Sequence, residues 1–294
     1  METKEACFRL VHETLPSTLS ESTRKTYSSV LVNHYMRYGD GSGCIMFFTT
    51  PVFLQSLESR NVNTQATILA AAYALTKNAN ILIRMHAVSK DIKETYKDQT
   101  MCEKRKNVAL TKAEIDNIFY EHVAKYDTNP TDRNLTDLLI TGLMSGVFPE
   151  LPPRRLMEYT ELKPHPPPRG HIASYNYIIT GPRGRLYMVI NRHKTSKTSS
   201  APHILPVPRE LSQLVLKAKE DGREFLFLNE KGEKFTSASL HHRLMGIYGF
   251  GVDMLRSVFL SDMHKGTPKL RKMEKVAKLM GNSVNAQVMC YVKK

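Results

Sequence analysis

The sequence lacks several features that would place it in common classes of protein. Tryptophan is absent, and the four cysteines are far apart and form no CxxC pair (Cys7, Cys44, Cys102 and Cys290). Zinc sites and disulfide frameworks use closely spaced cysteines, so the sequence predicts neither. No apolar run approaches the about 20 residues that cross a bilayer, and the acidic start METKEACFRL contains no hydrophobic signal region. We therefore expect an intracellular protein, in nucleus or cytoplasm, with reduced thiols and no membrane partner.

Acidic residues are scarce relative to basic ones. The chain has 42 Lys and Arg against 28 Asp and Glu, which gives a net charge of +14 and a pI near 9.6. Such an excess favours a polyanionic partner, nucleic acid first and an acidic membrane surface second. Residues 1–106 carry a net charge of +4, and residues 107–294 carry +10. No cluster of carboxylates stands out, so we expect neither a metal site nor another cofactor.

The chain is long enough for two domains, since it has 294 residues of which 41% are hydrophobic. Residues 1–106 contain helical patterns, with Ser20 or Ser22 as an N-cap and an Ala- and Leu-rich helix over 64–75. The polar segment 101–107 is typical of a linker. Thr111 and Glu114 then form a capping box, which predicts a helix and a domain boundary near 107.

The second domain, residues 107–294, contains three short extended runs at 174–180, 185–191 and 202–207, rich in β-branched and aromatic residues. A tight turn at 181–184 joins the first two, and a basic loop joins the second and third. They predict a three-stranded sheet. Further helices are expected at 131–144, 209–219, 237–248, 253–264, 269–280 and 284–291. The predicted fold class is mainly α with a small β-sheet: a helical first domain and an α+β second domain.

Basic and phenolic residues are spread along the second domain in a pattern that suits phosphodiester chemistry. They are Arg154, Arg155, Lys194, Arg256 and Tyr291. A tyrosine hydroxyl has a pKa of about 10, so it needs nearby cations or a base before it can attack phosphorus. Guanidinium groups can bind the non-bridging oxygens and stabilise the charge of the transition state. A lysine ammonium can protonate the departing 5′-oxygen.

The order of these motifs resembles that of the tyrosine recombinases, the integrase class that includes the Cre and Xer recombinases. In chain order the matching elements are Thr141-Gly142-Leu143, Arg155-x-x-Glu158, Lys194 between two strands, Asp253-x-x-Arg256, Gly281-Asn282, and Tyr291 nine residues after Asn282. The resemblance covers nearly the whole chain. The spellings Pro152-Pro153-Arg154-Arg155 and Asn191-Arg192-His193-Lys194-Thr195 look like the branch found in large DNA viruses and Crypton-type mobile elements.

This resemblance implies a site-specific DNA recombinase or integrase. Tyr291 would attack the scissile phosphate and form a 3′-phosphotyrosine and a free 5′-hydroxyl, without metal or ATP. The helical domain 1–106 would be a core-binding domain that clamps duplex DNA, with Arg24 and Lys25 among its contacts. The protein would act as a homo-oligomer, a dimer or a tetramer on DNA.

Two assignments stay open in the sequence. The R-x-x-E spacing selects Arg155 as the catalytic arginine and leaves Arg154 as a contact to a backbone phosphate. Lys194 is the favoured catalytic lysine. Its neighbours Arg192, His193 and Lys197 are then candidate DNA contacts, although Arg192 and Lys197 also compete for the catalytic role.

Two positions depart from the family pattern. Asp253 stands where the family usually has histidine, and could orient Arg256 or act as a base. Asn282 stands where histidine or tryptophan is usual, and an amide can still donate a hydrogen bond to a phosphate oxygen. These departures favour, as alternatives, a weakly active or inactive DNA-binding relative. A type IB topoisomerase is a third alternative, but its Ser-Lys-x-x-Tyr motif is absent, because Gln-Val-Met-Cys precedes Tyr291.

Overall fold

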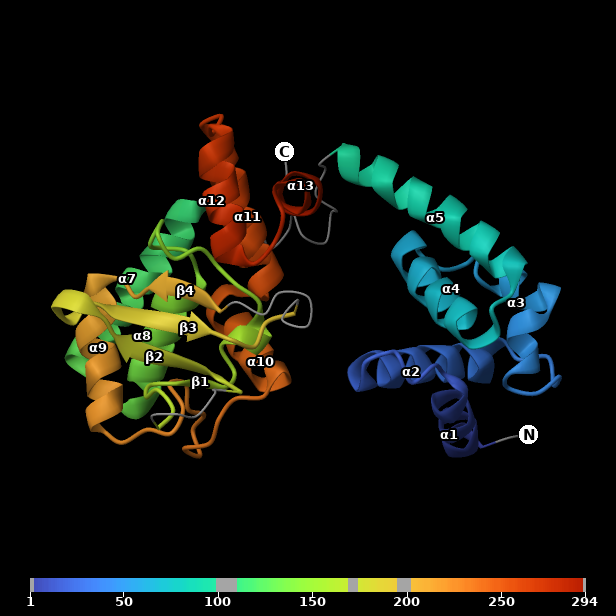
Figure 1. The fold of residues 1–294 in the computed structure, drawn as a ribbon, viewed down its shortest axis with the longest axis horizontal. Helices are drawn as coiled ribbons and strands as arrows, with labels where there is room; N and C mark the ends of the chain where they lie inside the picture. The colour runs from blue at the N-terminus through green and yellow to red at the C-terminus, as the bar shows by residue number, and fades with distance from the viewer. Residues whose placement is uncertain (1–2, 99–109, 169–173, 195–201, 293–294) are drawn as a thin grey trace. The chain divides into compact units, whose positions relative to one another are not determined.

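The computed structural model describes residues 3–98, 110–168, 174–194 and 202–292. The chain divides into two compact units, Met1–Asp98 and Gln99–Lys294 (Figure 1). The predicted boundary near 107 lies outside the described residues. Helices dominate both units, and the second contains one small sheet. The predicted fold class, mainly α with a small β-sheet, is therefore confirmed.

The first unit is a bundle of helices, most of which begin at a polar N-cap. It comprises α1 (Lys4–Thr14), α2 (Glu21–Tyr38), the 3₁₀ turn η1 (Met46–Thr49), α3 (Pro51–Ser56), α4 (Val62–Thr76) and α5 (Ala79–Lys97). Ser20, one of the two predicted caps, accepts a hydrogen bond from the Thr23 amide at 3.2 Å. The expected helix over 64–75 is confirmed as α4, which starts two residues earlier, after its cap Asn61.

Aromatic side chains fill the core of the first unit. Phe47, Phe48 and Phe53 are fully buried and pack edge to face, with ring centroids 5.2–5.8 Å apart. His34 is buried against them, and its Nε2 lies 2.8 Å from the Ser56 hydroxyl. Burial, together with Arg60 and Arg37, lowers the pKa of His34 to about 4. This histidine is therefore a neutral core residue at pH 7.

The sheet of the second unit has four strands in the order β1 (Leu162–Lys163), β2 (Asn176–Thr180), β3 (Leu186–Ile190), β4 (His203–Pro206). The three predicted strands are β2, β3 and β4, which pair antiparallel. The prediction of only three strands is wrong, because β1 pairs parallel with β2. A strand of two residues is too short to show an alternating pattern in the sequence.

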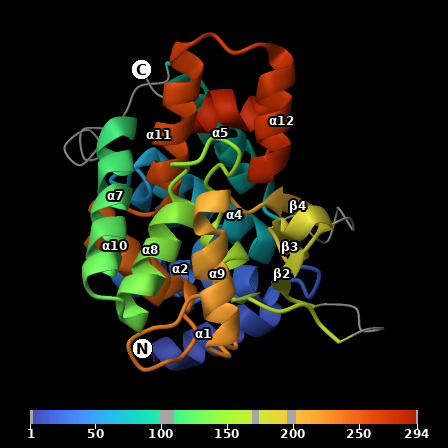
Figure 2. The same cartoon turned by 90° about the vertical axis from the view of Figure 1, so that its left-hand side faces the viewer.

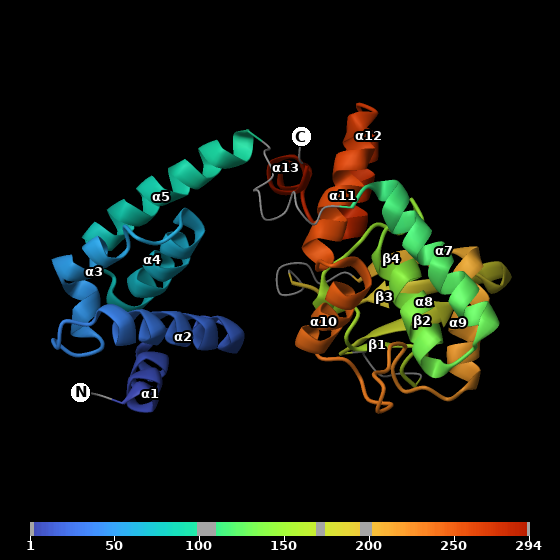
Figure 3. The ribbon, with the colours of Figure 1, turned by 180° about the vertical axis from the view of Figure 1, so that it is seen from behind.

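Helices cover the sheet and extend beyond it. Figure 3 shows α7 (Lys112–Thr128), α8 (Asp132–Met144) and α9 (Arg209–Glu220) over one face. The helices that follow are α10 (Ser237–Tyr248), α11 (Val252–Lys265) and α12 (Leu270–Met280) (Figure 2), and buried residues of α11 and α12 share one hydrophobic cluster. The predicted capping box is present at α7, where the Glu114 carboxylate accepts from the Thr111 amide at 2.7 Å and the Glu114 amide donates to Thr111.

The glycine of the Thr141-Gly142-Leu143 motif has a packing role. A Cβ at Gly142 would lie 2.7 Å from the Leu211 methyl groups, so its absence lets α9 approach α8 closely. Among the described helices, none alone is long and apolar enough to cross a membrane. The pair α10 and α11, bent by 53°, meets that test only together, by length and composition.

Candidate active site

Arg154 is held in a fully buried ion pair. The segment Pro152-Pro153-Arg154-Arg155 leads into the 3₁₀ turn η2 (Leu156–Glu158), which places Arg154 and Glu158 on the same side. Arg154 Nε donates to Glu158, Nη1 donates to the carbonyl of Leu279, and neither charged side chain has exposed surface. The structure thus pairs Glu158 of the R-x-x-E motif with Arg154, four residues away. Arg155 has extended backbone angles at the N-cap of η2, and its Nη1 donates to the Gly281 carbonyl instead.

The end of α12 binds three side chains from two other parts of the chain. The carbonyls of Lys278, Leu279 and Gly281 face His203, Arg154 and Arg155 respectively. His203 Nδ1 lies 3.1 Å from the Lys278 carbonyl oxygen, and Arg155 Nη1 donates to the Gly281 carbonyl at 3.0 Å. Carbonyls at a helix C-terminus lack partners within the helix and carry partial negative charge. They therefore suit cationic or N–H donors.

Arg256 lies beneath the ring of Tyr291. Arg256 comes from α11 and is fully buried, and its guanidinium carbon lies 4.5 Å from the centroid of the Tyr291 ring. Tyr291 ends the π-helical turn η4 (Gln287–Tyr291), which follows the short helix α13 (Val284–Ala286). Nε and Nη1 of Arg256 contact no hydrogen-bond partner among the described residues. The site thus holds donors that an incoming anion could use once the ring moves aside.

The electrostatic environment of Tyr291 shows which charges surround it. Burial raises the pKa of the Tyr291 phenol above its usual value, and Asp253 acts in the same direction. Arg256 and Arg155 oppose them and favour the phenolate. Arg155 therefore acts on the Tyr291 phenol together with Arg256, whereas Arg154 is held in its buried ion pair with Glu158.

Asn282 contacts Arg256 with its oxygen. With the amide oriented so that both its atoms are satisfied, Oδ1 accepts from Arg256 Nη2 and Nδ2 donates to the Ala277 carbonyl, each at 3.2 Å. The predicted donation to phosphate would require this amide to turn over. Asp253 is exposed in the first turn of α11, near enough to influence the pKa values of Arg256 and Tyr291.

The strand ends near the β3–β4 connection are fixed by a buried amide. Asn176 is 1% exposed, and its Nδ2 donates to the carbonyls of Glu158 at 2.8 Å and Arg192 at 3.1 Å. Its Oδ1 accepts from the Arg192 amide at 2.8 Å. Asn176 therefore joins the turn behind Arg154 and Arg155 to the chain just before Lys194.

The residues of the predicted lysine loop differ in their surroundings. Lys194 is exposed at a turn, and Lys197 lies outside the described residues. Arg192 is paired with Glu161 at the surface. His193 is 3% exposed, and burial, followed by Arg154 and Arg155, lowers its pKa, so it is a buried residue and not a surface one.

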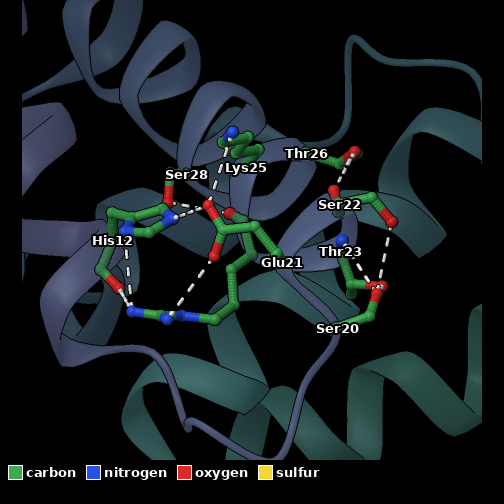
Figure 4. A network of polar contacts seen from close by, with 9 residues as sticks. His12, Ser20, Glu21, Ser22, Thr23, Lys25, Thr26 and Ser28 are labelled. Carbon is green, nitrogen blue, oxygen red and sulfur yellow. Dashed lines mark hydrogen bonds and ion pairs between the residues drawn. The ribbon is translucent and has the colours of Figure 1, made fainter.

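In the first unit, Arg24 and Lys25 belong to a polar network between α1 and α2. Figure 4 shows the imidazole of His12 and the ammonium of Lys25 directed at Glu21, at 3.4 Å and 3.5 Å. Arg24 donates to the His12 carbonyl at 2.6 Å and lies 3.7 Å from Glu21. Their contact with DNA stays a prediction, and Arg24 also ties the two helices together.

Three groups of the site escaped sequence reasoning: Asn176, His203 and the carbonyls that end α12. The glycine after α12 was a usable signal, because Gly281 adopts φ +63° as a C-terminal cap. Main-chain carbonyl acceptors cannot be predicted from residue types, because every residue has one. Among the described residues, no group of three or more His, Cys, Asp or Glu side chains could hold a metal ion.

Comparison with solved structures finds recombinases and integrases. The crystal structure of XerA recombinase is 13% identical with a TM-score of 0.39, over 99% of this chain and 95% of that one. A lambda integrase tetramer bound to a Holliday junction is 14% identical with a TM-score of 0.45, over 99% and 78%. A lambda integrase dimer bound to a COC′ core site is 14% identical with a TM-score of 0.44, over 98% of this chain and 76% of that one. No protein-family model and no curated protein matches the sequence. At these low values, an assignment of activity has to rest on the residues of the site.

Proposed function

We propose that the protein is a tyrosine recombinase that cleaves and rejoins duplex DNA through a 3′-phosphotyrosyl intermediate. The observation that carries this proposal is the placement of Tyr291 on Arg256, 4.5 Å from ring centroid to guanidinium carbon, with Arg155 acting on the same phenol. A nucleophile beside two guanidinium groups is the arrangement that phosphoryl transfer needs.

Each residue has a defined task in this reaction. The phosphate displaces the Tyr291 ring and accepts hydrogen bonds from Arg155 and from the unpartnered nitrogens of Arg256. Bringing charge from DNA into this site favours keeping both arginines ionised, and they in turn stabilise the extra charge of the pentacoordinate transition state. The energy of the broken bond stays in the phosphotyrosine, so rejoining needs no nucleotide cofactor.

The partner we propose is duplex DNA bound by an oligomer of this chain. The net charge of +14 favours a polyanion. Two of the similar structures are integrases bound to DNA, one as a dimer and one as a tetramer. We infer the same kind of substrate here, in whichever compartment holds that DNA.

A second candidate is a DNA-binding relative without efficient cleavage. Two observations favour it: burial raises the pKa of Tyr291, and the Asn282 amide nitrogen is engaged by Ala277. In that case the arginines would bind phosphate without a competent nucleophile.

Trapping the covalent intermediate tests the proposal. The protein is incubated with fragmented genomic DNA and nicked duplexes without metal, the reaction is stopped with detergent, and protein–DNA adducts are isolated. We expect an adduct with the wild type and none with Tyr291→Phe, which retains the ring over Arg256 and lacks the hydroxyl. Sequencing the trapped ends then gives the site.

Other outcomes separate the alternatives. Tight, salt-sensitive DNA binding without an adduct on any fragment would favour the non-catalytic relative. An adduct accompanied by relaxation of supercoiled plasmid without strand exchange would indicate a topoisomerase.

A further inference from the structure

Two imidazoles from the ends of β3 and β4 lie near the buried Arg154. His193 follows β3 and His203 begins β4, and their rings meet edge to face with centroids 4.6 Å apart. Strand pairing fixes this approach, because Ile190 is the register partner of His203. The charged groups that shift the pKa of Tyr291 include no histidine.

The hydrogen bond of His203 defines which ring nitrogen carries the proton. Nδ1 lies 3.1 Å from the Lys278 carbonyl oxygen, which can only accept, so Nδ1 is the N–H donor. In the neutral ring Nε2 then has the lone pair. No hydrogen bond to Nε2 occurs among the described residues, and His203 is only partly buried. Nε2 is therefore the nitrogen that can exchange a proton with a bound substrate.

The surroundings of His203 shift the pKa of its imidazole. Burial lowers its pKa most, and Arg154 and His193 add to the effect. The Lys278 carbonyl and Glu158 act in the opposite direction. These groups come from η2 and the segment before it, from the residues after β3, and from the end of α12. The lowered pKa leaves the ring mostly neutral at pH 7.

We propose that His203 is a proton-transfer residue of the strand-cleavage reaction, acting on the 5′-oxygen; this rests on the proposed function. In cleavage, Tyr291 Oη bonds to phosphorus, the P–O5′ bond breaks, and its electron pair takes the proton from Nε2 of the imidazolium. The phenol releases one proton to solvent, so the step is balanced. In rejoining, the 5′-hydroxyl gives its proton to Nε2 as O5′ attacks phosphorus and the tyrosine oxygen leaves.

The test compares His203→Asn with the wild type on a duplex that carries the trapped site. Asparagine can place an N–H where Nδ1 lies and so keep the bond to the Lys278 carbonyl, but it has no group that titrates. General acid–base catalysis contributes about 10²–10⁴-fold, so we expect single-turnover cleavage to slow by about 100-fold or more. His242→Asn, which changes an exposed histidine on α10, serves as the control and is expected to cleave at the wild-type rate.

A substrate with sulfur in place of O5′ makes the test specific for the proton. Thiols have a pKa of about 8.5, so a thiolate leaves without being protonated. On this substrate His203→Asn should cleave as fast as the wild type. The wild-type cleavage rate on the oxygen substrate should fall as the pH rises through the imidazole pKa, and His203→Asn should lose this dependence.

The outcomes are distinguishable. A wild type that forms no adduct on any DNA would overturn the proposed function and this inference with it. An adduct formed equally fast by His203→Asn would overturn the inference alone. Sulfur rescue of Lys194→Ala but not of His203→Asn would assign the proton to Lys194 and also overturn it. An unchanged melting temperature for His203→Asn excludes misfolding as the cause of a slow rate.

Discussion

At the scale of single residues, the site depends on buried charged groups that have few hydrogen-bond partners within reach. Arg154 has no exposed surface and uses Glu158 and a carbonyl, while Arg256 is covered by the Tyr291 ring. Removing one partner of a buried ion pair leaves an uncompensated charge, which costs about 3–5 kcal/mol. Small changes beside these side chains are therefore expected to alter stability and geometry together.

Gly281 is one such position. It adopts φ +63°, and a Cβ there would lie 2.9 Å from Arg154 Nη2. Gly281→Ala should combine left-handed strain, of about 1–3 kcal/mol, with displacement of the guanidinium. Gly249→Ala is the matched control, because Gly249 has φ +76° and open space around its position. Urea denaturation should show a larger loss for Gly281→Ala, and only this variant should slow adduct formation. Equal losses would contradict a specific contact with Arg154.

His34 predicts a dependence of stability on pH in the first unit. Its pKa is about 4 in the folded protein and about 6.5 in an unfolded chain. The unfolded chain thus binds more protons between these pH values. The free energy of unfolding is therefore unaffected by this histidine above about pH 6.5 and decreases as the pH falls towards 4. His34→Gln removes this group, so its urea midpoint at pH 5 should lie closer to its midpoint at pH 7 than that of the wild type. An identical pH dependence in both proteins would contradict the assignment.

At the scale of elements, the site is assembled where a turn, a strand end and a helix end meet. Asn176 on β2 holds the turn η2 and the chain after β3, and the end of α12 holds Arg154, Arg155 and His203. The sheet and α12 therefore act as the scaffold of the site, while Tyr291 lies on the short turn η4.

Replacing Asn176 should loosen this assembly. Asn176→Ala leaves the Glu158 carbonyl and both main-chain groups of Arg192 without their side-chain partner. An unsatisfied buried polar group costs about 1–3 kcal/mol, and we expect a loss of that order or more in urea denaturation. Asn191→Ala, which removes a single bond to the Tyr175 carbonyl, should cost less. A smaller loss for Asn176→Ala than for this control would contradict its role as a joint.

Sequence patterns predict the long elements well and the contacts between them poorly. The capping box at Thr111 and Glu114 and the helix over 237–248 follow from local rules, and the structure confirms both. The strand β1 escapes because two residues show no periodicity. The pairing of Glu158 with Arg154 escapes because it depends on the backbone angles of an extended segment. The position of His203 depends on strand register, which local patterns do not specify.

At the scale of the whole molecule, the charge distribution should govern DNA binding. On α12, Arg271, Lys272 and Lys275 are exposed, and this helix supplies carbonyls to the site. Lysines at this place can neutralise phosphates beside a bound duplex without reading its sequence.

A salt titration tests this surface. Each lost phosphate contact should reduce the slope of log affinity against log salt by about 1. The double variant Lys272→Ala, Lys275→Ala should therefore bind all duplexes more weakly and with a shallower slope. The double variant Lys217→Ala, Lys231→Ala removes the same charge from other exposed positions and should change the slope less. Equal slopes for the two variants would indicate that only net charge matters.

The acceptors at the end of α12 have a consequence for how this protein can diverge. Lys278 and Leu279 contribute peptide oxygens to His203 and Arg154, so a substitution of the exposed Lys278 side chain keeps this contact, whereas Leu279 also packs against the core. Gly281 is the exception, since its backbone angle and the nearby guanidinium both exclude a larger residue. Homologues of this chain could thus differ at many side chains of α12 and still keep the same backbone acceptors. Comparison of backbone structures would then detect distant homologues better than comparison of sequences.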